Sequence, residues 1–306
     1  MNDSKIYDCI VVGCGPSGMT AALYLLRAGK SVLLLEKDSI GGQIAKSPRL
    51  ENFPSIKSIS GSDFADQLFE QITDLGAEFE LEDVTEITKD VDVFRVKTNF
   101  NLYDARTVII AAGCTHRHLG LEREEELTGH GISYCAVCDG GFFVGEDVLL
   151  IGDANTALQY AISLSGTSKS VFIATLFDKF FADNLLVERM KKIPNISFRH
   201  NLSATKFLGE SEIEGVTFED TKTGEVVTIP CKGCFIAVGQ EPHNEAFKNL
   251  VDLDPKGFIV VDKNMRTLTP GLYAVGDCTS KTVRQVATAT ADGAIAAVDA
   301  TNYLNR

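Results

Sequence analysis

The sequence of 306 residues lacks the marks of a membrane or secreted protein. No unbroken apolar run is long enough to cross a bilayer, and the opening Met1-Asn2-Asp3-Ser4-Lys5 contains no apolar region of a signal peptide. We therefore expect a cytoplasmic protein with no membrane partner. Because 44% of the residues are hydrophobic and 23% are charged, the chain suits two ordinary domains with full cores.

Basic residues are outnumbered, and histidines are few. The 29 Lys and Arg against 42 Asp and Glu leave a formal net charge of −13, which repels the phosphates of a nucleic acid and argues against such a partner. The five histidines share no spacing typical of metal ligands, and we expect no metal site. No low-complexity segment or long linker interrupts the chain.

Eight cysteines scattered through a chain of this size do not indicate a secreted disulfide scaffold. Two of them, Cys135 and Cys138, are separated by two residues and followed by Asp139. This pattern suits dithiol chemistry because the sulfurs can close a small ring and Asp139 is placed to move a proton. Half of a zinc site has the same spacing, so the pair alone leaves both functions open.

A second pair, Cys231 and Cys234, raises the possibility of a four-cysteine zinc site. The long separation from the first pair and the place of Cys234 at the head of a buried strand disfavour that site. We expect the remaining cysteines to pack in the cores; they are Cys9, Cys14, Cys114 and Cys278.

A glycine-rich turn follows the first predicted strand. The apolar run from Cys9 to Val12 leads into Gly13-Cys14-Gly15-Pro16-Ser17-Gly18 and then into a helical pattern from Met19 to Ala28. In such a turn Gly13 permits the bend, Gly15 lets a pyrophosphate approach, and Gly18 lets the helix pack closely on the sheet. The next strand, Ser31 to Leu35, ends on Glu36, whose carboxylate can bind the hydroxyls of an unphosphorylated ribose, as in FAD or NAD.

Two later strands favour FAD. Thr107 to Gly113 is a buried strand that ends in Ala112-Gly113, and Gly271 to Asp277 ends in Gly276-Asp277. In flavoenzymes with two dinucleotide domains, such strands pass under the cofactor, and the final Asp binds its ribityl and pyrophosphate region.

The middle of the chain repeats this design. A strand from Val148 to Ile151 is followed by Gly152-Asp153-Ala154-Asn155-Thr156-Ala157, a helix from Leu158 to Leu164 and further strands at Ser170 to Ala174 and Cys234 to Gly239. We predict an α/β fold of two Rossmann-like, three-layer dinucleotide-binding domains, the second inserted into the first. The first comprises residues 1–115 and 245–306, and the second comprises residues 116–244.

Together these motifs resemble the low-molecular-weight thioredoxin reductases over essentially the whole chain. The resemblance rests on the first glycine turn, Gly41-Gly42-Gln43, Glu51-Asn52-Phe53-Pro54, the segment from Cys135 to Gly140, Val275-Gly276-Asp277 and Arg284-Gln285. It implies a homodimer with one FAD per chain and thioredoxin as the partner. It also implies that Cys138 faces the flavin, Cys135 attacks the partner disulfide, and Asp139 acts as acid and base. The implied FAD contacts are Gly13, Gly15, Pro16, Ser17, Gly18, Glu36, Lys37, Gly42, Gln43, Asn52, Val84, Ala112, Gly113, Gly276, Asp277, Arg284, Gln285, Val286 and Ala287.

The second domain departs from the members of this family that use NADPH. Those members carry a full glycine fingerprint and a His-Arg-Arg-x-x-x-Arg cluster around the 2′-phosphate. Here Ala154 replaces the middle glycine, Asp153 puts a carboxylate at the anion site, and the basic positions hold Thr175, Leu176, Phe177 and Phe181. Each lost charge-assisted bond is worth about 1.5–3 kcal/mol, so we expect no use of NADPH.

In this respect the sequence resembles the ferredoxin-dependent flavin thioredoxin reductases, in which an iron–sulfur protein delivers single electrons to FAD. We therefore expect ferredoxin as the donor, docked on basic residues because ferredoxins are usually acidic. One basic cluster comprises Arg189, Lys191, Lys192 and Arg199. A second cluster in the flavin domain, which we prefer, comprises Arg27, Lys30, Lys37, Lys46 and Arg49.

Three alternatives stay open: a second FAD in the central site, an atypical NAD(P)H-dependent thioredoxin reductase, and a non-catalytic redox-sensing flavoprotein. The intact Cys135, Cys138 and Asp139 argue against the last. A reductase of a peroxide system is disfavoured, because no thioredoxin-like domain precedes residue 1.

Overall fold

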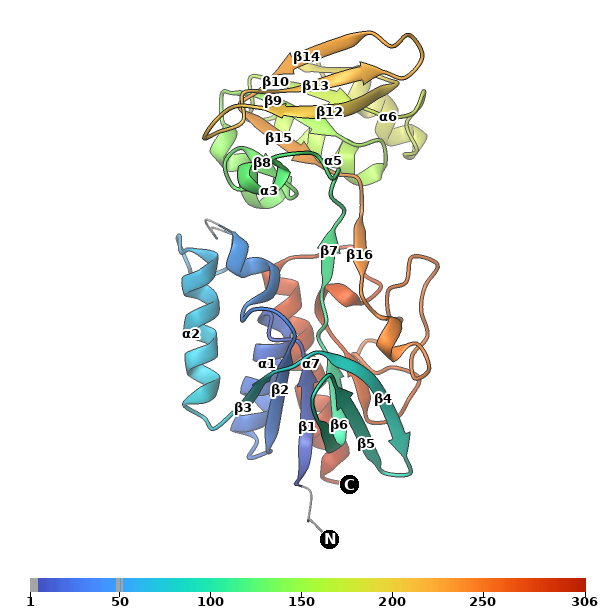
Figure 1. Cartoon of the computed structure of the whole chain (residues 1–306). Helices are drawn as coiled ribbons and strands as arrows, with labels where there is room; N and C mark the ends of the chain where they lie inside the picture. Colours follow the sequence, from blue (N-terminus) through green and yellow to red (C-terminus); the bar gives the residue numbers. More distant parts are fainter. Residues whose placement is uncertain (1–4, 48–49, 51) are drawn as a thin grey trace. The chain divides into compact units, whose positions relative to one another are not determined.

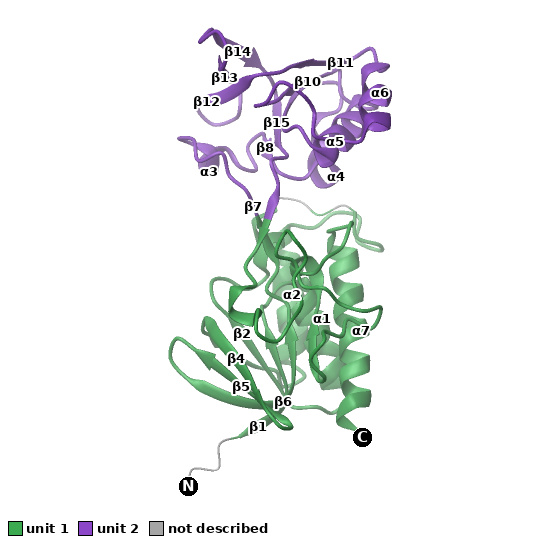
Figure 2. Cartoon of the chain, turned by 90° about the vertical axis from the view of Figure 1, so that its right-hand side faces the viewer, with its two compact units in different colours: residues 1–115, 241–306 green, residues 116–240 purple. Residues whose placement is uncertain are grey.

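The chain folds into two compact units in the computed structural model, which describes residues 5–47, 50 and 52–306. Unit 1 combines residues 1–115 with 241–306, and unit 2 comprises residues 116–240 (Figure 2). The return to unit 1 thus falls four residues before the predicted return at residue 245. Both crossings are short strands, β7 (Cys114–His116) and β16 (Gln240–Pro242), which pair with each other.

Unit 1 is built on a seven-stranded sheet (Figure 1). Its strands run in the order β3-β2-β1-β6-β5-β4, with β17 also paired to β6. Strands β1, β2, β3, β6 and β17 are parallel, and β4 and β5 extend the sheet in antiparallel pairs. The bounds are β1 Ile6–Val12, β2 Val32–Glu36, β3 Glu78–Leu81, β4 Val84–Asp90, β5 Val93–Thr98, β6 Leu102–Ile110 and β17 Leu272–Ala274.

Helices cover one face of this sheet and bring the first glycine turn to its carboxyl edge. Helix α1 starts at Pro16, directly after Gly15, because proline fits the first helical position without losing a needed N–H bond. A Cβ at Gly293 of α7 would overlap the carbonyl oxygen of Ser17, so the two helices pack closely there. The helical bounds are α1 Pro16–Arg27, η1 Gly42–Lys46, α2 Gly61–Thr73, η3 Glu245–Phe247, η4 Gly276–Cys278 and α7 Val286–Leu304.

Unit 2 has three layers. A five-stranded parallel sheet in the order β11-β10-β9-β15-β8 packs on one side against α5 and α6 and on the other against a three-stranded antiparallel sheet. The strands are β8 Ile132–Ser133, β9 Asp147–Ile151, β10 Ser170–Ala174, β11 Ile196–Arg199, β12 Leu202–Leu208, β13 Gly215–Asp220, β14 Val226–Pro230 and β15 Gly233–Ile236. The helices are α3 Glu124–Leu127, α4 Ala136–Asp139, η2 Gly140–Phe143, α5 Asn155–Ser165 and α6 Asn184–Lys191.

The predicted α/β class with one Rossmann-like domain inserted into another is confirmed. The predicted strands at residues 107–113 and 271–277 end earlier, at Ile110 and Ala274, because the chain turns away at the carboxyl edge. Gly113 there has a φ of +67°, which glycine adopts without strain. Among the helices of residues 5–47, 50 and 52–306, none is both long and apolar enough to cross a membrane.

Candidate active site

Cys135 and Cys138 form a disulfide in unit 2. The one-turn helix α4 begins directly after Cys135, so the two Cα atoms lie 5.3 Å apart and the sulfurs face each other. The backbone N–H groups of Cys138 and Asp139 donate to the carbonyl oxygen of Cys135, at 3.2 and 3.0 Å. Val137, between the two cysteines, is 55% exposed, which leaves the helix accessible to a macromolecular partner. This geometry suits reversible dithiol chemistry.

Asp139 is a partly buried carboxyl beside this disulfide. Its Oδ2 accepts a hydrogen bond of 2.6 Å from the hydroxyl of Ser133. Its Oδ1 is buried and has no hydrogen-bond partner among the described residues. Burial raises the pKa of the Asp139 carboxyl, and the bond from Ser133 opposes that shift. The group therefore retains a proton more readily than an exposed aspartate does.

The second cysteine pair lies in the core of unit 2. Cys231 and Cys234 are both buried free thiols that pack in one hydrophobic cluster with Leu127 and Phe218. Burial raises the pKa of Cys231 to about 12 and the pKa of Cys234 well above its ordinary value. In the described part of the chain, no group of three or more His, Cys, Asp or Glu residues is arranged to hold a metal ion. The second pair therefore has the packing of core residues.

The first glycine turn leaves open space at the start of α1. A Cβ at Gly13, whose φ is +108°, would overlap the carbonyl oxygen of Ala111, so glycine is required there. A Cβ at Gly15 would meet a single atom within 4 Å, Gly41 O at 3.9 Å. This is the space that a pyrophosphate needs to reach the N–H groups of a helix N-terminus.

Glu36 lies against the same turn. Its carboxylate accepts hydrogen bonds from the backbone N–H groups of Cys14, Lys37 and Asp38, at 2.7, 2.9 and 3.0 Å. These bonds hold the buried carboxylate at the carboxyl end of β2, where a ribose can approach it.

Most of the predicted FAD residues lie together at the carboxyl edge of the unit 1 sheet, where segments distant in sequence contact one another. Gly42 faces Gly15, since a Cβ at Gly42 would lie 3.6 Å from the Gly15 Cα atom. A Cβ at Gly276 would lie 2.5 Å from the hydroxyl of Ser17. Further contacts join the amide of Gln43 to the carbonyl oxygen of Cys114, and Asn52 to Gln285 with a bond of 3.0 Å. Gly113 precedes Cys114, and Val286 and Ala287 open α7 directly after Gln285.

Asp277 carries a carboxylate oxygen that fits a cofactor. Its Oδ1 is buried without a hydrogen-bond partner among the described residues, and burial raises the pKa of this carboxyl while Lys281 and Arg284 oppose the shift. An orphaned acceptor of this kind is costly unless a donor reaches it. A ribityl hydroxyl of FAD is such a donor, so the residues present fit the flavin.

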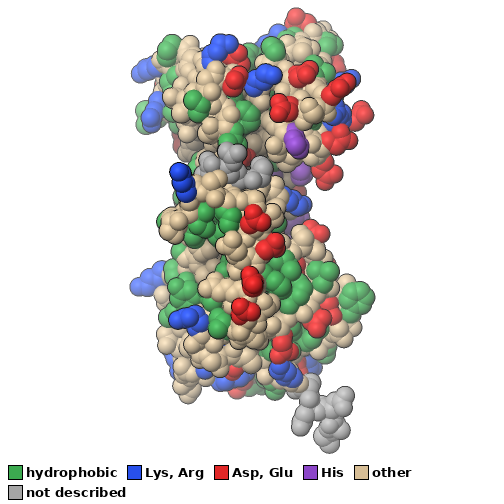
Figure 3. Space-filling view, turned by 90° about the vertical axis from the view of Figure 1, so that its left-hand side faces the viewer, with side chains coloured by type: hydrophobic (Ala, Val, Ile, Leu, Met, Phe, Trp, Pro, Cys, Tyr) green, Lys and Arg blue, Asp and Glu red, His purple; other side chains and the backbone are tan. Residues whose placement is uncertain are grey.

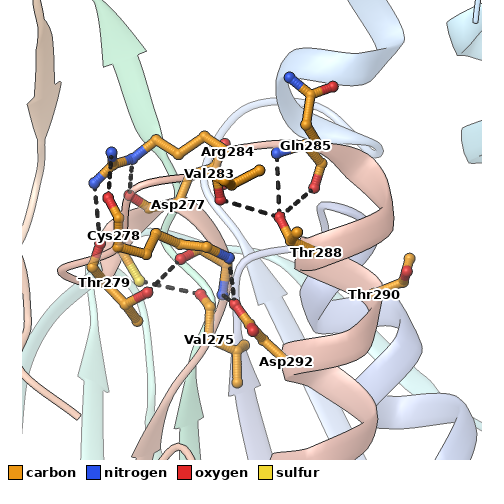
Figure 4. A network of polar contacts seen from close by, with 12 residues as sticks. Val275, Asp277, Cys278, Thr279, Val283, Arg284, Gln285, Thr288, Thr290 and Asp292 are labelled. Atoms are coloured by element: carbon orange, nitrogen blue, oxygen red, sulfur yellow. Dashed lines mark hydrogen bonds and ion pairs between the residues drawn. The ribbon is translucent and has the colours of Figure 1, made fainter. Parts of the chain in front are cut away.

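Two predicted FAD contacts have other surroundings. The guanidinium of Arg284 donates to the carbonyl oxygens of Asp277 and Thr279 (Figure 4). It also donates to the carbonyl oxygen of Lys281 and lies 4.1 Å from the ring centroid of Phe258. It therefore holds the loop that carries Asp277. Val84 is buried in the hydrophobic core with partly buried Ala112 packed against the same cluster. Glu51 lies outside the described residues.

The second glycine turn has a different lining. Ala154 caps α5 with an extended backbone, and the N–H of Phe181 donates to the carbonyl oxygen of Asp153 at 2.8 Å. Thr175 is fully buried, and its hydroxyl contacts Phe177 O and His200 Nδ1 at 2.9 and 2.6 Å. Side chains at three of the predicted phosphate-binding positions are about half exposed and apolar; they are Leu176, Phe177 and Phe181.

Sequence reasoning missed residues at both sites. Lys179 Nζ lies 5.2 Å from the ring centroid of Phe181, and Lys222 Nζ lies 3.8 Å from Asp178, so cations do stand near the second turn. A search for lysines around the phenylalanines could have found Lys179. No sequence pattern indicated a role for Ser133, because its contact with Asp139 follows from the fold of the intervening turn.

The preferred basic cluster does not form one surface, which corrects the prediction. Arg27 is the last residue of α1 and Lys30 lies between α1 and β2, whereas Lys37 and Lys46 follow the carboxyl end of β2. Because β1 and β2 are parallel, these pairs lie at opposite edges of the sheet. Arg49 lies outside the described residues.

Two of the four residues in the other basic cluster form ion pairs. Arg199 binds Asp220 and Glu225 at 2.8 and 2.7 Å, and Lys191 binds Glu188 at 3.1 Å. On the face in Figure 3, Lys and Arg side chains are scattered among Asp, Glu and uncharged side chains.

A dinucleotide turn in one α/β domain and a redox disulfide in a second, inserted domain define a disulfide oxidoreductase of the two-domain type. The model of the pyridine nucleotide-disulphide oxidoreductase family matches residues 7–293. The chain is 38% identical over 304 residues to a thioredoxin reductase of Listeria monocytogenes, covering 99% of this chain and 95% of the relative. It is 37% identical over 305 residues to that of Bacillus subtilis, with coverages of 99% and 96%.

A solved structure gives the same result. The crystal structure of thioredoxin reductase from Streptococcus pyogenes matches 98% of each chain with a TM-score of 0.94 and 37% identity. The chain therefore belongs to the thioredoxin reductase family, whose members are flavin disulfide oxidoreductases. Membership in this family does not distinguish between electron donors.

Proposed function

We propose that this protein reduces thioredoxin through the Cys135–Cys138 pair, with one FAD per chain, as a homodimer. The observation that carries the proposal is the disulfide on an accessible helical turn with the partly buried Asp139 carboxyl beside it. The relatives' name, thioredoxin reductase, supports thioredoxin as the substrate.

The residue roles follow from thiol–disulfide exchange. In the reduced protein, Cys135 loses its proton to Asp139 and attacks a sulfur of the thioredoxin disulfide. The thioredoxin thiolate that leaves is then protonated by Asp139. Cys138 then loses its proton to Asp139 and attacks Cys135 Sγ, which releases the second thiolate, and that thiolate is protonated in turn. Two electrons and two protons thereby reach thioredoxin, and the Cys135–Cys138 disulfide forms again.

When bound, FAD would supply the electrons for the Cys135–Cys138 pair, because a flavin can take up electrons singly and release them in pairs. The N–H groups at the Gly13 to Gly18 turn would hold its pyrophosphate, Glu36 its adenosine ribose, and Asp277 its ribityl chain. Each of these groups has the open space or acceptor atom described above.

The proposed electron donor is reduced ferredoxin. Support comes from the second turn, where Ala154, Leu176 and Phe177 replace the contacts that a dinucleotide phosphate needs. NADPH is the second candidate donor, because the family is named for pyridine nucleotides and because Lys179 and Lys222 stand near the second turn.

A donor screen on the purified holoprotein tests both candidates. We expect the absorbance of oxidised FAD to persist with NADPH or NADH and to bleach with reduced ferredoxin under anaerobic conditions. Rapid bleaching by either nicotinamide would overturn the ferredoxin assignment. Thioredoxin turnover with an artificial flavin reductant tests the disulfide reductase separately, and its absence would favour a redox sensor. Counting FAD after denaturation distinguishes one flavin per chain from two, and sedimentation tests the homodimer.

A further inference from the structure

Ser133 contacts both Asp139 and the backbone of Cys135 in unit 2. It is the last residue of β8, pairs with Phe235 of β15 and is 5% exposed, so its position is set by the sheet. Its Oγ lies 2.6 Å from Asp139 Oδ2 and 3.0 Å from the backbone nitrogen of Cys135. One hydroxyl therefore contacts both the carboxyl and the backbone of the attacking cysteine.

The direction of these bonds follows from proton counting. A serine hydroxyl has one proton and two lone pairs. The backbone N–H of Cys135 can only donate, so Ser133 Oγ accepts from it. The single hydroxyl proton is left for an acceptor, and Asp139 Oδ2 at 2.6 Å competes with Cys135 O at 3.4 Å. The shorter bond to a carboxylate is the stronger one, so Ser133 donates to Asp139.

The two oxygens of Asp139 consequently differ. Oδ2 is held by Ser133, whereas Oδ1 is buried without a partner among the described residues. A buried oxygen that lacks a donor is stabilised by carrying a proton itself. The proton of a neutral Asp139 therefore belongs on Oδ1.

We propose that Ser133 is a positioning residue. Its hydrogen bond to Asp139 Oδ2 leaves Oδ1 as the atom that carries the proton in the dithiol reaction. This inference rests on the proposed function of Asp139 as the acid and base of the Cys135–Cys138 pair. Ser133 makes no contact with thioredoxin or flavin in this role. It acts by orienting the carboxyl and by stabilising its charged form.

The titratable groups that face Asp139 are few. Helix α5 packs against α4 and contributes Tyr160, which senses the charge of Asp139. Burial raises the pKa of Tyr160, so its phenol is neutral when Asp139 titrates. Cys138 stands on α4 itself and Cys135 directly precedes it, and η2, which also packs against α4, has no titratable side chain.

Removing the Ser133 hydroxyl should raise the pKa of Asp139. A hydrogen bond to the carboxylate favours the charged form and lowers the pKa of Asp139, so its removal raises that pKa further. In Ser133→Ala, Asp139 then accepts a thiol proton only at higher pH. We expect the rising limb of the pH–rate profile to move up by about one pH unit, a tenfold change in the acid constant.

The test uses the chemically reduced holoprotein and an aromatic disulfide, 5,5′-dithiobis(2-nitrobenzoic acid), followed by stopped flow from about pH 5 to pH 9. A Cys135→Ser, Cys138→Ser variant corrects for other thiols. Ser133→Ala should shift the limb upward. The matched control is Ser168→Ala, since Ser168 of the same unit is 7% exposed and its hydroxyl has no hydrogen-bond partner among the described residues. This control should follow the unmodified protein.

Two further sets of variants distinguish a hydrogen-bonding role of Ser133 from a role in packing alone. In an Asp139→Asn background, Ser133→Ala should cause no additional shift, whereas an equal shift there would overturn the proposal. Ser133→Thr and Ser133→Val have nearly the same shape and differ in the hydroxyl, so they decide the question if Ser133→Ala does not fold. The threonine variant should keep the unmodified profile and the valine variant should show the shift; superimposed profiles would overturn the role of Ser133.

Thioredoxin and the electron donor are both absent from this assay. A protein that fails to reduce thioredoxin can still show the predicted shift, which would contradict the proposed function and support the role of Ser133. A protein that reduces thioredoxin but shows no shift would contradict the role of Ser133 alone.

Discussion

The two glycine turns of the chain share a backbone and differ in what surrounds it. Gly13 and Gly152 both have positive φ values, +108° and +153°, and a Cβ at either would overlap a carbonyl oxygen, that of Ala111 or Ala237. Helices α1 and α5 both begin after a residue with extended backbone, Gly15 or Ala154. The scaffold of a dinucleotide site is therefore present twice.

The difference lies in the side chains that would face a ligand. In unit 1, Gly15 leaves space and Glu36 presents a carboxylate held by three backbone N–H groups. In unit 2, Ala154 adds a methyl group, and Thr175 is bonded inward to His200. Residues that form the turn are constrained by the fold, whereas residues that line it are not. A dinucleotide contact can consequently disappear while the domain keeps its shape.

Loss of either sulfur of the disulfide in unit 2 should abolish most of the reductase activity. Replacing Cys135 or Cys138 by Ser should lower thioredoxin turnover by about 10³-fold or more, because the exchange needs both sulfurs. FAD content should stay unchanged, since the proposed FAD contacts belong to unit 1. Cys231→Ala, which removes a buried free thiol of the same unit, should retain turnover. Full turnover by Cys135→Ser would refute the assigned role.

A matched pair of substitutions tests the comparison of the turns. Gly15→Leu should weaken FAD binding by about 100-fold, because its side chain would fill the space at the helix N-terminus and displace the pyrophosphate. Ala154→Leu at the equivalent position should leave FAD binding unchanged. Fluorescence titration of the apoprotein with FAD measures both. Equal losses would mean that the substitutions act through folding and not through the cofactor site.

Adding cations to the second glycine turn should restore affinity for a 2′-phosphate. Leu176→Arg with Phe177→Arg restores two cations at exposed positions of the second turn and should raise NADPH affinity by about tenfold or more. NADH affinity should change little, because NADH lacks the 2′-phosphate. Calorimetric titration measures both nucleotides. The control is Leu185→Arg on α6, a residue 85% exposed, and an equal gain there would indicate non-specific attraction.

Lys37 and Lys46 of unit 1 test where reduced ferredoxin binds. Neutralising Lys37 and Lys46 to Ala should slow electron entry from reduced ferredoxin by about threefold at low salt and flatten its salt dependence. Neutralising Arg27 and Lys30, at the opposite edge of the sheet, should not. Stopped-flow reduction of FAD at several ionic strengths measures the rates. Equal slowing by both pairs would rule out a single docking edge.

Much of the architecture follows from local sequence. A strand, a glycine turn and a helix are contiguous at Gly13 and again at Gly152, so short-range sterics predict both. Cys135 and Cys138 are three residues apart, and one helical turn is enough to bring their sulfurs together. The absence of cations at Leu176 and Phe177 is likewise visible without a structure.

The tertiary structure decided the properties that depend on distant segments. Arg27 and Lys37 are near in sequence, yet parallel pairing of β1 and β2 sends them to opposite edges. Arg284 faces loop carbonyls because Phe258, from another loop, packs on its guanidinium. Pairing of β8 with β15 fixes Ser133 in the sheet, and the turn that follows brings Asp139 within 2.6 Å of its hydroxyl. Sequence alone determined which chemical groups the protein has and their local turns; long-range packing determined which of those groups meet.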